Sequence, residues 1–452
     1  MYGFQIRFRK RQGEPDMFRP GGRDWALRHE GDAGNLLEVH LCHIAALAMK
    51  RPNVRPIGPL LVDRIAAAQT MYCALMDIEE HGGEAPGPNG LRLESLCNSE
   101  RWEMCRTMAG DLRSGGYQPG PERKVKIPKS SGKGFRELSI QNLEDRMVAR
   151  AAVIILDPLV DPTMSPFSYG FRHNRNSHWA LATALALTAR EGRPIWIAAD
   201  VANAFDMVPH RRFLDLVRRR FPDDVAKVID QITCSGKKRG FRQGSPASPF
   251  FFNLYADHFV DRAFQKRVAD GRLLRYADDL LVLCRTVAEA EEVGAVLSQV
   301  ARAGGLPLKE NMAIINIESG TPIDWLGYRV QWQGGAPAIT IAPKAWKKLG
   351  ADFDEAHIKP FPAIRAVERI NAWFDYLGPC YPAEDRDEVV AQVRSLALAQ
   401  GFIELPSAQE MHDYWLQAFE QWKDTRVFVE GELSTWLAQL PTWKLGAAGG
   451  WR

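Results

Sequence analysis

Apolar and polar positions form their clearest pattern at residues 273–284, where two short apolar runs flank the polar tetrad Tyr276–Asp279. Apolar runs of this length around a turn are typical of a β-hairpin. We therefore predict a hairpin that carries Asp278 and Asp279 at its tip. An aspartate pair at a hairpin tip is most often part of a solvated turn. Whether this pair has a function therefore has to be judged from other residues of the chain.

The same pattern analysis predicts a mixture of strands and helices around this hairpin. Strands are expected at residues 124–128, 135–140, 195–200, 313–317 and 324–332. Helices are expected from Asp63 to Glu80, at 98–114, from Asn142 to a stop at Pro158, from Pro209, at 249–269, and from Thr286 to Gly304. After Lys344 the pattern becomes helical, and seven of the 13 tryptophans lie in residues 346–451. This region is expected to be a helical C-terminal domain with an aromatic core.

Composition places the chain among ordinary globular proteins. Its 452 residues are enough for about two to four domains. No apolar run approaches the roughly 18 residues of a membrane span, and the N-terminus lacks the apolar core of a signal peptide. Seven cysteines without a C-x-x-C pair favour a reducing compartment and argue against structural zinc. We therefore expect a cytoplasmic protein without a membrane partner.

The net charge is only +3, but the basic residues are clustered. Residues 121–136 contain one acid, Glu122, and the bases Arg123, Lys124, Lys126, Lys129, Lys133 and Arg136. Such a patch on a nearly neutral protein suits a groove that holds phosphates. The run Arg218–Arg220 fits a phosphate contact and a solvated helix face equally well.

Asp200 ends the predicted strand 195–200, just as Asp278 and Asp279 stand at the hairpin tip. If the strand and the hairpin were neighbours in one sheet, three carboxylates would meet. Buried carboxylates have to be paired or bound to metal, and oxygen ligands suit Mg²⁺. With the Val201 carbonyl as a further ligand, this set could hold two Mg²⁺ (or Mn²⁺) ions about 3.5–4 Å apart, as in-line phosphoryl transfer requires.

Several motifs, in order along the chain, resemble those of reverse transcriptases, specifically the bacterial enzymes related to group II intron proteins. The motifs are Asp145-Arg146, Ser168–Arg172, Asp200–Asp206, Gly240–Pro249, Tyr276–Asp279 and Trp325–Tyr328. The resemblance implies an α+β right-hand polymerase with fingers, a palm with an antiparallel sheet, and a helical thumb. The implied domains are an N-terminal extension (1–62), fingers with part of the palm (63–192), the palm (193–335) and the thumb (336–452).

The resemblance also implies roles for single residues. Asp200, Asp278 and Asp279 would be the catalytic carboxylates, and Val201 would join them as a metal ligand. The dNTP would contact Lys129, Arg136, Phe205, Gln243 and Gly244. The Phe205 ring would exclude a 2′-hydroxyl, with a plain core aromatic as the alternative. The primer grip would be Trp325, Leu326, Gly327 and Tyr328, and RNA would contact Arg172 and Arg175.

One departure from the lineage concerns the lysine expected after the catalytic hairpin. Met312 stands in its place, and nearby Lys309 could substitute for it, so no general acid is assigned. The implied partners are an RNA template, dNTPs and the cDNA product, whereas the primer and the oligomeric state stay open.

The motifs are compatible with three functions. A stand-alone enzyme without an endonuclease resembles defence-associated reverse transcriptases, which implies a dedicated non-coding RNA and cDNA synthesis against phage. The first alternative is an intron-encoded reverse transcriptase and maturase that binds its intron RNA for splicing and mobility. An inactive RNA-binding scaffold is the second, and the intact set of three aspartates argues against it.

Overall fold

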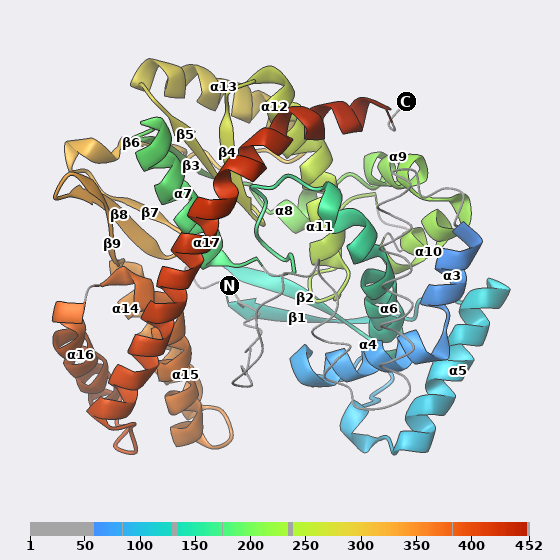
Figure 1. Ribbon diagram of the computed structural model, residues 1–452. Coiled ribbons are helices and arrows are strands. Elements are labelled where there is room, and N and C mark those ends of the chain that lie inside the picture. Colours follow the sequence, from blue (N-terminus) through green and yellow to red (C-terminus); the bar gives the residue numbers. More distant parts are fainter. Residues whose placement is uncertain are drawn as a thin grey trace.

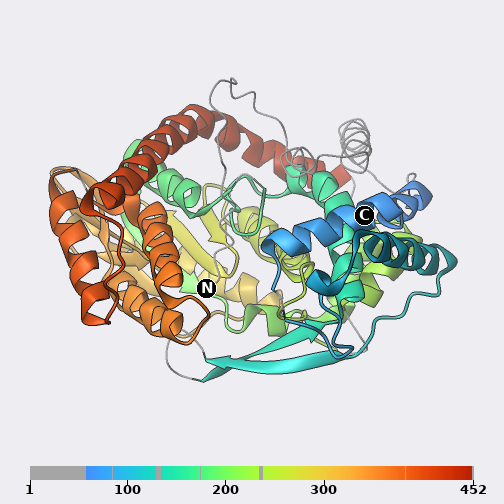
Figure 2. The same ribbon diagram turned by 90° about the horizontal axis from the view of Figure 1, so that it is seen from below.

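The computed structural model describes residues 58–449, apart from Glu84, 129–133, Asn174, 234–237 and Pro382. Figure 1 and Figure 2 show these residues from two directions. Most of the predicted N-terminal extension and the predicted dNTP ligand Lys129 therefore lie outside the described residues. None of the described helices is long and apolar enough to cross a membrane.

The N-terminal part consists of four helices and a long hairpin. The helices are α3 (Gly58–Ile65), α4 (Ala68–His81), α5 (Asn98–Ser114) and α6 (Leu143–Val160). The hairpin pairs β1 (Glu122–Pro128) with β2 (Phe135–Gln141) and extends from these helices toward the side of the molecule that carries the C-terminal helices (Figure 2). Both strands and α5 confirm the predictions.

Two helix boundaries differ from the predictions. The expected helix from Asp63 to Glu80 is two helices, α3 and α4, with a break after Ile65. Pro158 lies inside α6 instead of ending it. Because Leu159 and Val160 beyond the proline are buried in the core, their packing can offset the hydrogen bond that a proline removes from a helix.

A four-stranded antiparallel sheet lies at the centre, in the order β4-β5-β3-β6. Its strands are β3 (Ile195–Asp200), β4 (Arg272–Tyr276), β5 (Asp279–Cys284) and β6 (Ala313–Asn316). β4 and β5 form the predicted hairpin. Successive residues of β3 face opposite sides of the sheet: Ile195 and Ile197 belong to one hydrophobic core, and Trp196 to the other.

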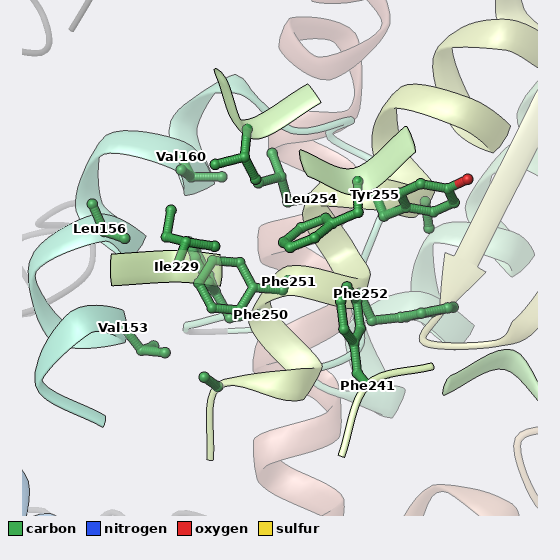
Figure 3. Packing of buried hydrophobic residues seen from close by; sticks show 14 of the residues in the cluster. Val153, Leu156, Val160, Ile229, Phe241, Phe250, Phe251, Phe252, Leu254 and Tyr255 are labelled. Atoms are coloured by element: carbon green, nitrogen blue, oxygen red, sulfur yellow. The ribbon is translucent and has the colours of Figure 1, made fainter. Parts of the chain in front are cut away.

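The first core lies under helices on one side of this sheet. They are α8 (Ala204–Met207), α9 (His210–Arg220), α10 (Asp223–Thr233), α11 (Ser248–Ala256), α12 (Arg262–Arg267) and α13 (Val287–Ala303). The predicted helix 249–269 is present as α11 and α12, joined by a π-helical turn, Asp257–Asp261. Figure 3 shows Phe250 and Phe251 of α11 on the side of Ile229 of α10 and of α6, and Phe252 beside Phe241.

The second core lies between α7 (Ser177–Glu191), a three-stranded sheet and the C-terminal helices. The sheet has the order β7-β8-β9, with β7 (Ile323–Trp325), β8 (Tyr328–Gln333) and β9 (Ala336–Ile341). The predicted strand 324–332 is thus interrupted by a turn at Leu326 and Gly327, and β9 was not predicted.

The C-terminal helices are α14 (Pro343–His357), α15 (Pro362–Leu377), α16 (Arg386–Ala399) and α17 (Ala408–Gly449). The long helix α17 runs back across α7 (Figure 1). Four C-terminal tryptophans are buried, namely Trp373, Trp415, Trp422 and Trp436. This confirms the predicted aromatic core.

Candidate active site

The central sheet brings the three predicted carboxylates to one place. Asp200, the last residue of β3, lies directly opposite Asp279, the first residue of β5. Tyr276 pairs with Asp279, so Ala277 and Asp278 form a two-residue turn in which Ala277 has a φ of +56°. The backbone N–H of Val201 donates to the Asp278 carbonyl over 3.0 Å, which ties the end of β3 to that turn.

Burial and mutual repulsion shift the protonation of the three acids. Burial and the charge of Asp200 raise the pKa of Asp278. Burial, a hydrogen bond shared with Asp200 and the charge of Asp278 raise the pKa of Asp279 to about 9. The shared hydrogen bond, helped by Lys309 and opposed by burial, lowers the pKa of Asp200. The site is therefore crowded with negative charge, which a cation would relieve.

Lys309 is the cation that the structure places at Asp200. Its backbone N–H donates to the Asp200 carbonyl over 2.8 Å, and its Nζ lies 3.1 Å from Asp200 Oδ2. From the sequence, Lys309 is a possible substitute for the expected lysine, and no general acid is assigned. The positive charge of this partly exposed lysine therefore offsets part of the negative charge at Asp200.

The donor set suits a hard divalent cation. Among the described residues, no three His, Cys, Asp or Glu side chains already stand close enough together to form a metal site. Asp200 and Asp279 are nevertheless in contact, and Asp278 is next to them in the turn. Mg²⁺ prefers carboxylate oxygens as ligands. A bound cation would also relieve the burial and repulsion that raise the pKa values of Asp278 and Asp279.

A loop at residues 165–172 packs against the hairpin tip, and Arg172 is the residue of this loop that was predicted to contact RNA. The loop pairs with β4, because Tyr169 N–H donates to the Arg275 carbonyl over 2.8 Å and Arg275 N–H donates to the Phe167 carbonyl over 2.9 Å. Gly170 lies so close to the tip that a Cβ atom there would be 2.3 Å from the Ala277 nitrogen. Only glycine fits at this position.

A buried ion pair anchors the same tip. The Arg275 guanidinium donates to Asp261 in the π-helical turn over 2.8–3.0 Å, to Asn253 Oδ1 over 2.8 Å and to the Ala277 carbonyl over 3.2 Å. Asn253 in turn donates to the Gly170 carbonyl over 2.6 Å. π-Helical turns are often found at functional sites. The signal available in the sequence was a charged residue, Arg275, in the apolar run just before the aspartates. Its partner Asp261 could not be identified from the sequence.

Phe205 lies in the short helix α8, five residues after Asp200, and is half-buried. Its ring packs on Phe252 of the first core with centroids 4.9 Å apart, and it meets Phe171 edge-on at 6.1 Å. The inner face of the ring thus contributes to the core, while the ring also faces the loop that supports the hairpin. Both predicted roles, core aromatic and sugar contact, remain compatible with this position.

Gln243 and Gly244 lie against the β1–β2 hairpin. The Gln243 amide donates to both carboxylate oxygens of Asp206 over 3.0–3.1 Å, and Ser139 N–H donates to the Gln243 carbonyl over 2.7 Å. Gly244 has a φ of +110°, and a Cβ there would be 3.0 Å from the Ser139 carbonyl oxygen. The close backbone approach at Gly244 is therefore made to β2.

Arg136 is the described member of the predicted triphosphate-binding pair. It is exposed on β2, and its charge acts to lower the pKa of Asp278. Its predicted companion Lys129 lies outside the described residues.

The predicted primer-grip segment forms the tight turn between β7 and β8. Leu326 and Gly327 occupy the turn with φ values of +51° and +86°. Trp325 and Tyr328 are buried, and the Tyr328 hydroxyl donates to the Tyr376 carbonyl over 2.9 Å. Leu326 is buried as well, and its carbonyl accepts from the Tyr376 hydroxyl, so Gly327 is the partly exposed residue of this segment.

The structure places Arg172, which was predicted to contact RNA, among protein groups. Its buried guanidinium donates to the Asp161 carboxylate over 2.5 Å and to the carbonyls of Ser165 and Ser168 over 2.7–2.8 Å. Arg172 instead fastens the loop that supports the hairpin.

The structure likewise places Arg175 against protein groups. Its guanidinium donates to the Pro166 carbonyl and lies 5.4 Å from the centroids of the Tyr169 and Trp436 rings. Burial lowers the pKa of Arg175 to about 10. This residue therefore joins the loop to α17, and the interior contacts of both arginines could not be predicted from their motif.

Comparison with known proteins agrees with this geometry. Residues 127–330 match the reverse transcriptase (RNA-dependent DNA polymerase) family. The chain is 34% identical over 212 residues to protein YkfC of Escherichia coli, covering 44% of this chain and 55% of YkfC. It is 27% identical over 171 residues to the group II intron-encoded protein LtrA of Lactococcus lactis, covering 35% of this chain and 28% of LtrA.

A third relative is the 91 kDa protein in the cob intron of Schizosaccharomyces pombe, 29% identical over 188 residues, with 36% of this chain and 23% of that protein covered. The chain thus spans about half or less of the length of these relatives. The matched region contains all three aspartates, both strands that carry them and the β7–β8 turn. Residues 127–330 therefore match a reverse transcriptase domain, and the mixed helical and antiparallel-sheet fold is consistent with that match.

Proposed function

We propose that this protein is an RNA-directed DNA polymerase that copies an RNA template into cDNA by nucleotidyl transfer. The observation that carries the proposal is the meeting of Asp200, Asp278 and Asp279 at one end of the central sheet, inside the matched reverse transcriptase region. Residues 63–192 would be fingers with part of the palm, residues 193–335 the palm, and residues 336–452 the thumb.

Two Mg²⁺ ions would complete the site, with Mn²⁺ as a substitute. Asp200, Asp278 and the Val201 carbonyl would hold them, with Asp279 as the third carboxylate. When bound, the ions would stabilise charge on the attacking and leaving oxygens. The raised pKa values of Asp278 and Asp279 support this assignment, because a cation would favour their charged forms.

The remaining residues would position the substrates. Arg136 would offset the charge of the incoming triphosphate, together with Lys129. Phe205 would lie under the sugar and exclude a 2′-hydroxyl, with Gln243 and Gly244 beside it. The Leu326–Gly327 turn would present backbone groups to the primer end.

We further propose that the template is a dedicated non-coding RNA and that the cDNA serves antiphage defence, as the resemblance to defence-associated enzymes implies. The alternative is an intron-encoded reverse transcriptase and maturase. The similarity to LtrA, a group II intron-encoded protein, is the observation that favours it.

The experiment is to sequence the RNA and DNA that co-purify with the protein, beside a variant with Asp278→Asn and Asp279→Asn. One abundant RNA, with complementary DNA only in the wild type, would support both parts of the proposal. If that RNA carries splice sites and is spliced, the maturase alternative is correct. If the DNA also accompanies the variant, the assignment of the carboxylates fails.

A further inference from the structure

A cavity of about 420 Å³ lies between α9, the π-helical turn with α12, and the C-terminal end of α13. These helices follow the upper edge of the molecule in Figure 1. We propose that this cavity binds a phosphate and the adjoining base of single-stranded RNA, as a second RNA contact outside the catalytic centre. The inference rests on the proposed function only in taking RNA as the ligand.

The lining combines an apolar floor with basic side chains. Phe259, Ala263 and Val300 supply apolar surface, and Phe259 is half-buried with its ring packed 4.4 Å from that of Tyr255. The basic side chains are Arg212 and Arg219 of α9 and Arg267 of α12. Because these groups come from different elements, the fold itself assembles them around one space.

The three guanidiniums are held by uncharged acceptors. Arg212 donates to the Ala303 carbonyl at the end of α13, Arg219 donates to a backbone carbonyl of α9 over 3.1 Å, and Arg267 donates to the Gln299 side chain over 3.4 Å. These bonds fix the side chains without neutralising them. The cavity therefore keeps a positive potential.

One acid, Asp215, also lines the cavity, and its carboxylate lies 3.9 Å from the Arg218 guanidinium at the cavity's edge. Three arginines thus face one acid. Further exposed bases on the same helices are Arg211, Lys266 and Arg302. The surface around the cavity therefore favours an anion.

The chemistry of the lining points to a nucleotide unit. The planar fork of a guanidinium matches a phosphate in a bidentate manner. An aromatic ring in the same cavity offers a stacking surface that every base can use. The volume lies within the range of about 300–1,000 Å³ that is usual for small-molecule sites. An acidic peptide would use the arginines but leave Phe259 without a stacking partner.

One residue that lines the cavity is also close in sequence to a residue of the proposed catalytic centre. Gly304 lines the cavity, and Lys309, five residues later, contacts Asp200. The intervening segment is bound to the end of β3, since Ala202 N–H donates to the Pro307 carbonyl over 2.8 Å. Five residues span at most about 18 Å. The Gly304 edge of the cavity therefore lies within about 18 Å of Lys309.

The test measures binding of a fluorescent single-stranded oligouridylate to the full chain across a range of salt concentrations. The variant is Arg219→Ala with Arg267→Ala. Loss of the one phosphate contact should reduce the slope of log affinity against log salt by about 0.7 and weaken binding about fourfold near physiological salt. The matched control is Arg106→Ala with Arg113→Ala, two exposed arginines on α5, which should leave both values unchanged.

Two further measurements make the result specific. Arg219→Lys with Arg267→Lys should restore the salt slope, because it restores the charges. Photo-crosslinking with 5-iodouridine RNA should label Phe259 in the wild type. Equal slopes and affinities for the cavity variant and the α5 control, with no crosslink at Phe259, would overturn the proposal.

Because binding is read without synthesis, this result stands apart from the proposed polymerase activity. Primer extension on a short primer–template, run on the same preparations, reports that activity separately. A wild-type protein that binds RNA through the cavity but makes no DNA would refute the polymerase assignment alone.

Discussion

Gly170→Ala tests whether the 165–172 loop holds the catalytic hairpin in place. An alanine Cβ at this position would be 2.3 Å from the Ala277 nitrogen and 3.1 Å from its Cα, whereas ordinary contacts begin at 3.4 Å. The loop cannot easily withdraw, because Asn253 donates to the Gly170 carbonyl and Tyr169 N–H donates to the Arg275 carbonyl. The hairpin tip must therefore move by about 1 Å, and Asp278 moves with it.

A displacement of about 1 Å in a catalytic group can lower the rate on the order of 100-fold. We therefore expect kcat for primer extension by Gly170→Ala to fall by about that factor, with RNA affinity nearly unchanged because the loop's contacts are internal. Steady-state primer extension and equilibrium RNA binding, measured on the same preparation, separate the two effects.

The matched control is Gly110→Ala in α5, where a Cβ would have no atom within 4 Å. Alanine is preferred over glycine inside a helix by about 1 kcal/mol, so this variant should be as active as the wild type and equally or more resistant to unfolding. If Gly170→Ala also keeps the wild-type rate, while the Ala277 turn keeps its place, the idea that this loop positions the hairpin is refuted.

Three other substitutions test single residues. Arg136→Ala should raise the KM for dNTPs several-fold without changing the melting temperature, because the side chain is exposed; unchanged kinetics would remove it from the triphosphate site. Phe205→Ala should relax discrimination against ribonucleotides, and an unchanged dNTP/NTP selectivity with reduced stability would leave its ring, packed on Phe252, a core residue. Arg172→Met should lower the free energy of unfolding by about 3–5 kcal/mol at neutral pH with little effect on RNA affinity. Burial tends to raise the pKa of Asp161, but the Arg172 charge outweighs burial and lowers that pKa. The difference in unfolding free energy between the wild type and the variant should therefore shrink as acid protonates Asp161. Calorimetry at several pH values would measure this difference.

The hairpin and the strand that carry the aspartates could be predicted from the sequence, because each depends on the pattern of neighbouring residues. Two apolar runs around Tyr276–Asp279 were enough for the hairpin, and Asp200 stood at the end of an apolar strand. The pairing of β3 with β5, which places Asp200 opposite Asp279, is a matter of register between distant segments. Only the resemblance to a known family indicated it beforehand.

The contacts that the sequence did not reveal depend on the whole fold. Arg172 looked like a basic residue in a polar-aromatic loop, but its partner Asp161 and the surrounding carbonyls bury it. The close approach of the Gly170 backbone to Ala277 is likewise a tertiary contact. Strand β9 escaped prediction because Pro337 weakens the strand pattern, yet β9 lies at a sheet edge, where proline is tolerated.

The most direct test of the central claim is primer extension by the purified full chain on an RNA template with a DNA primer, dNTPs and Mg²⁺. We expect full-length cDNA from the wild type and none from the variant with Asp278→Asn and Asp279→Asn, although both bind the template with similar affinity. DNA synthesis that survives in the variant, or its absence from a folded, RNA-binding wild type with both Mg²⁺ and Mn²⁺, would contradict the account.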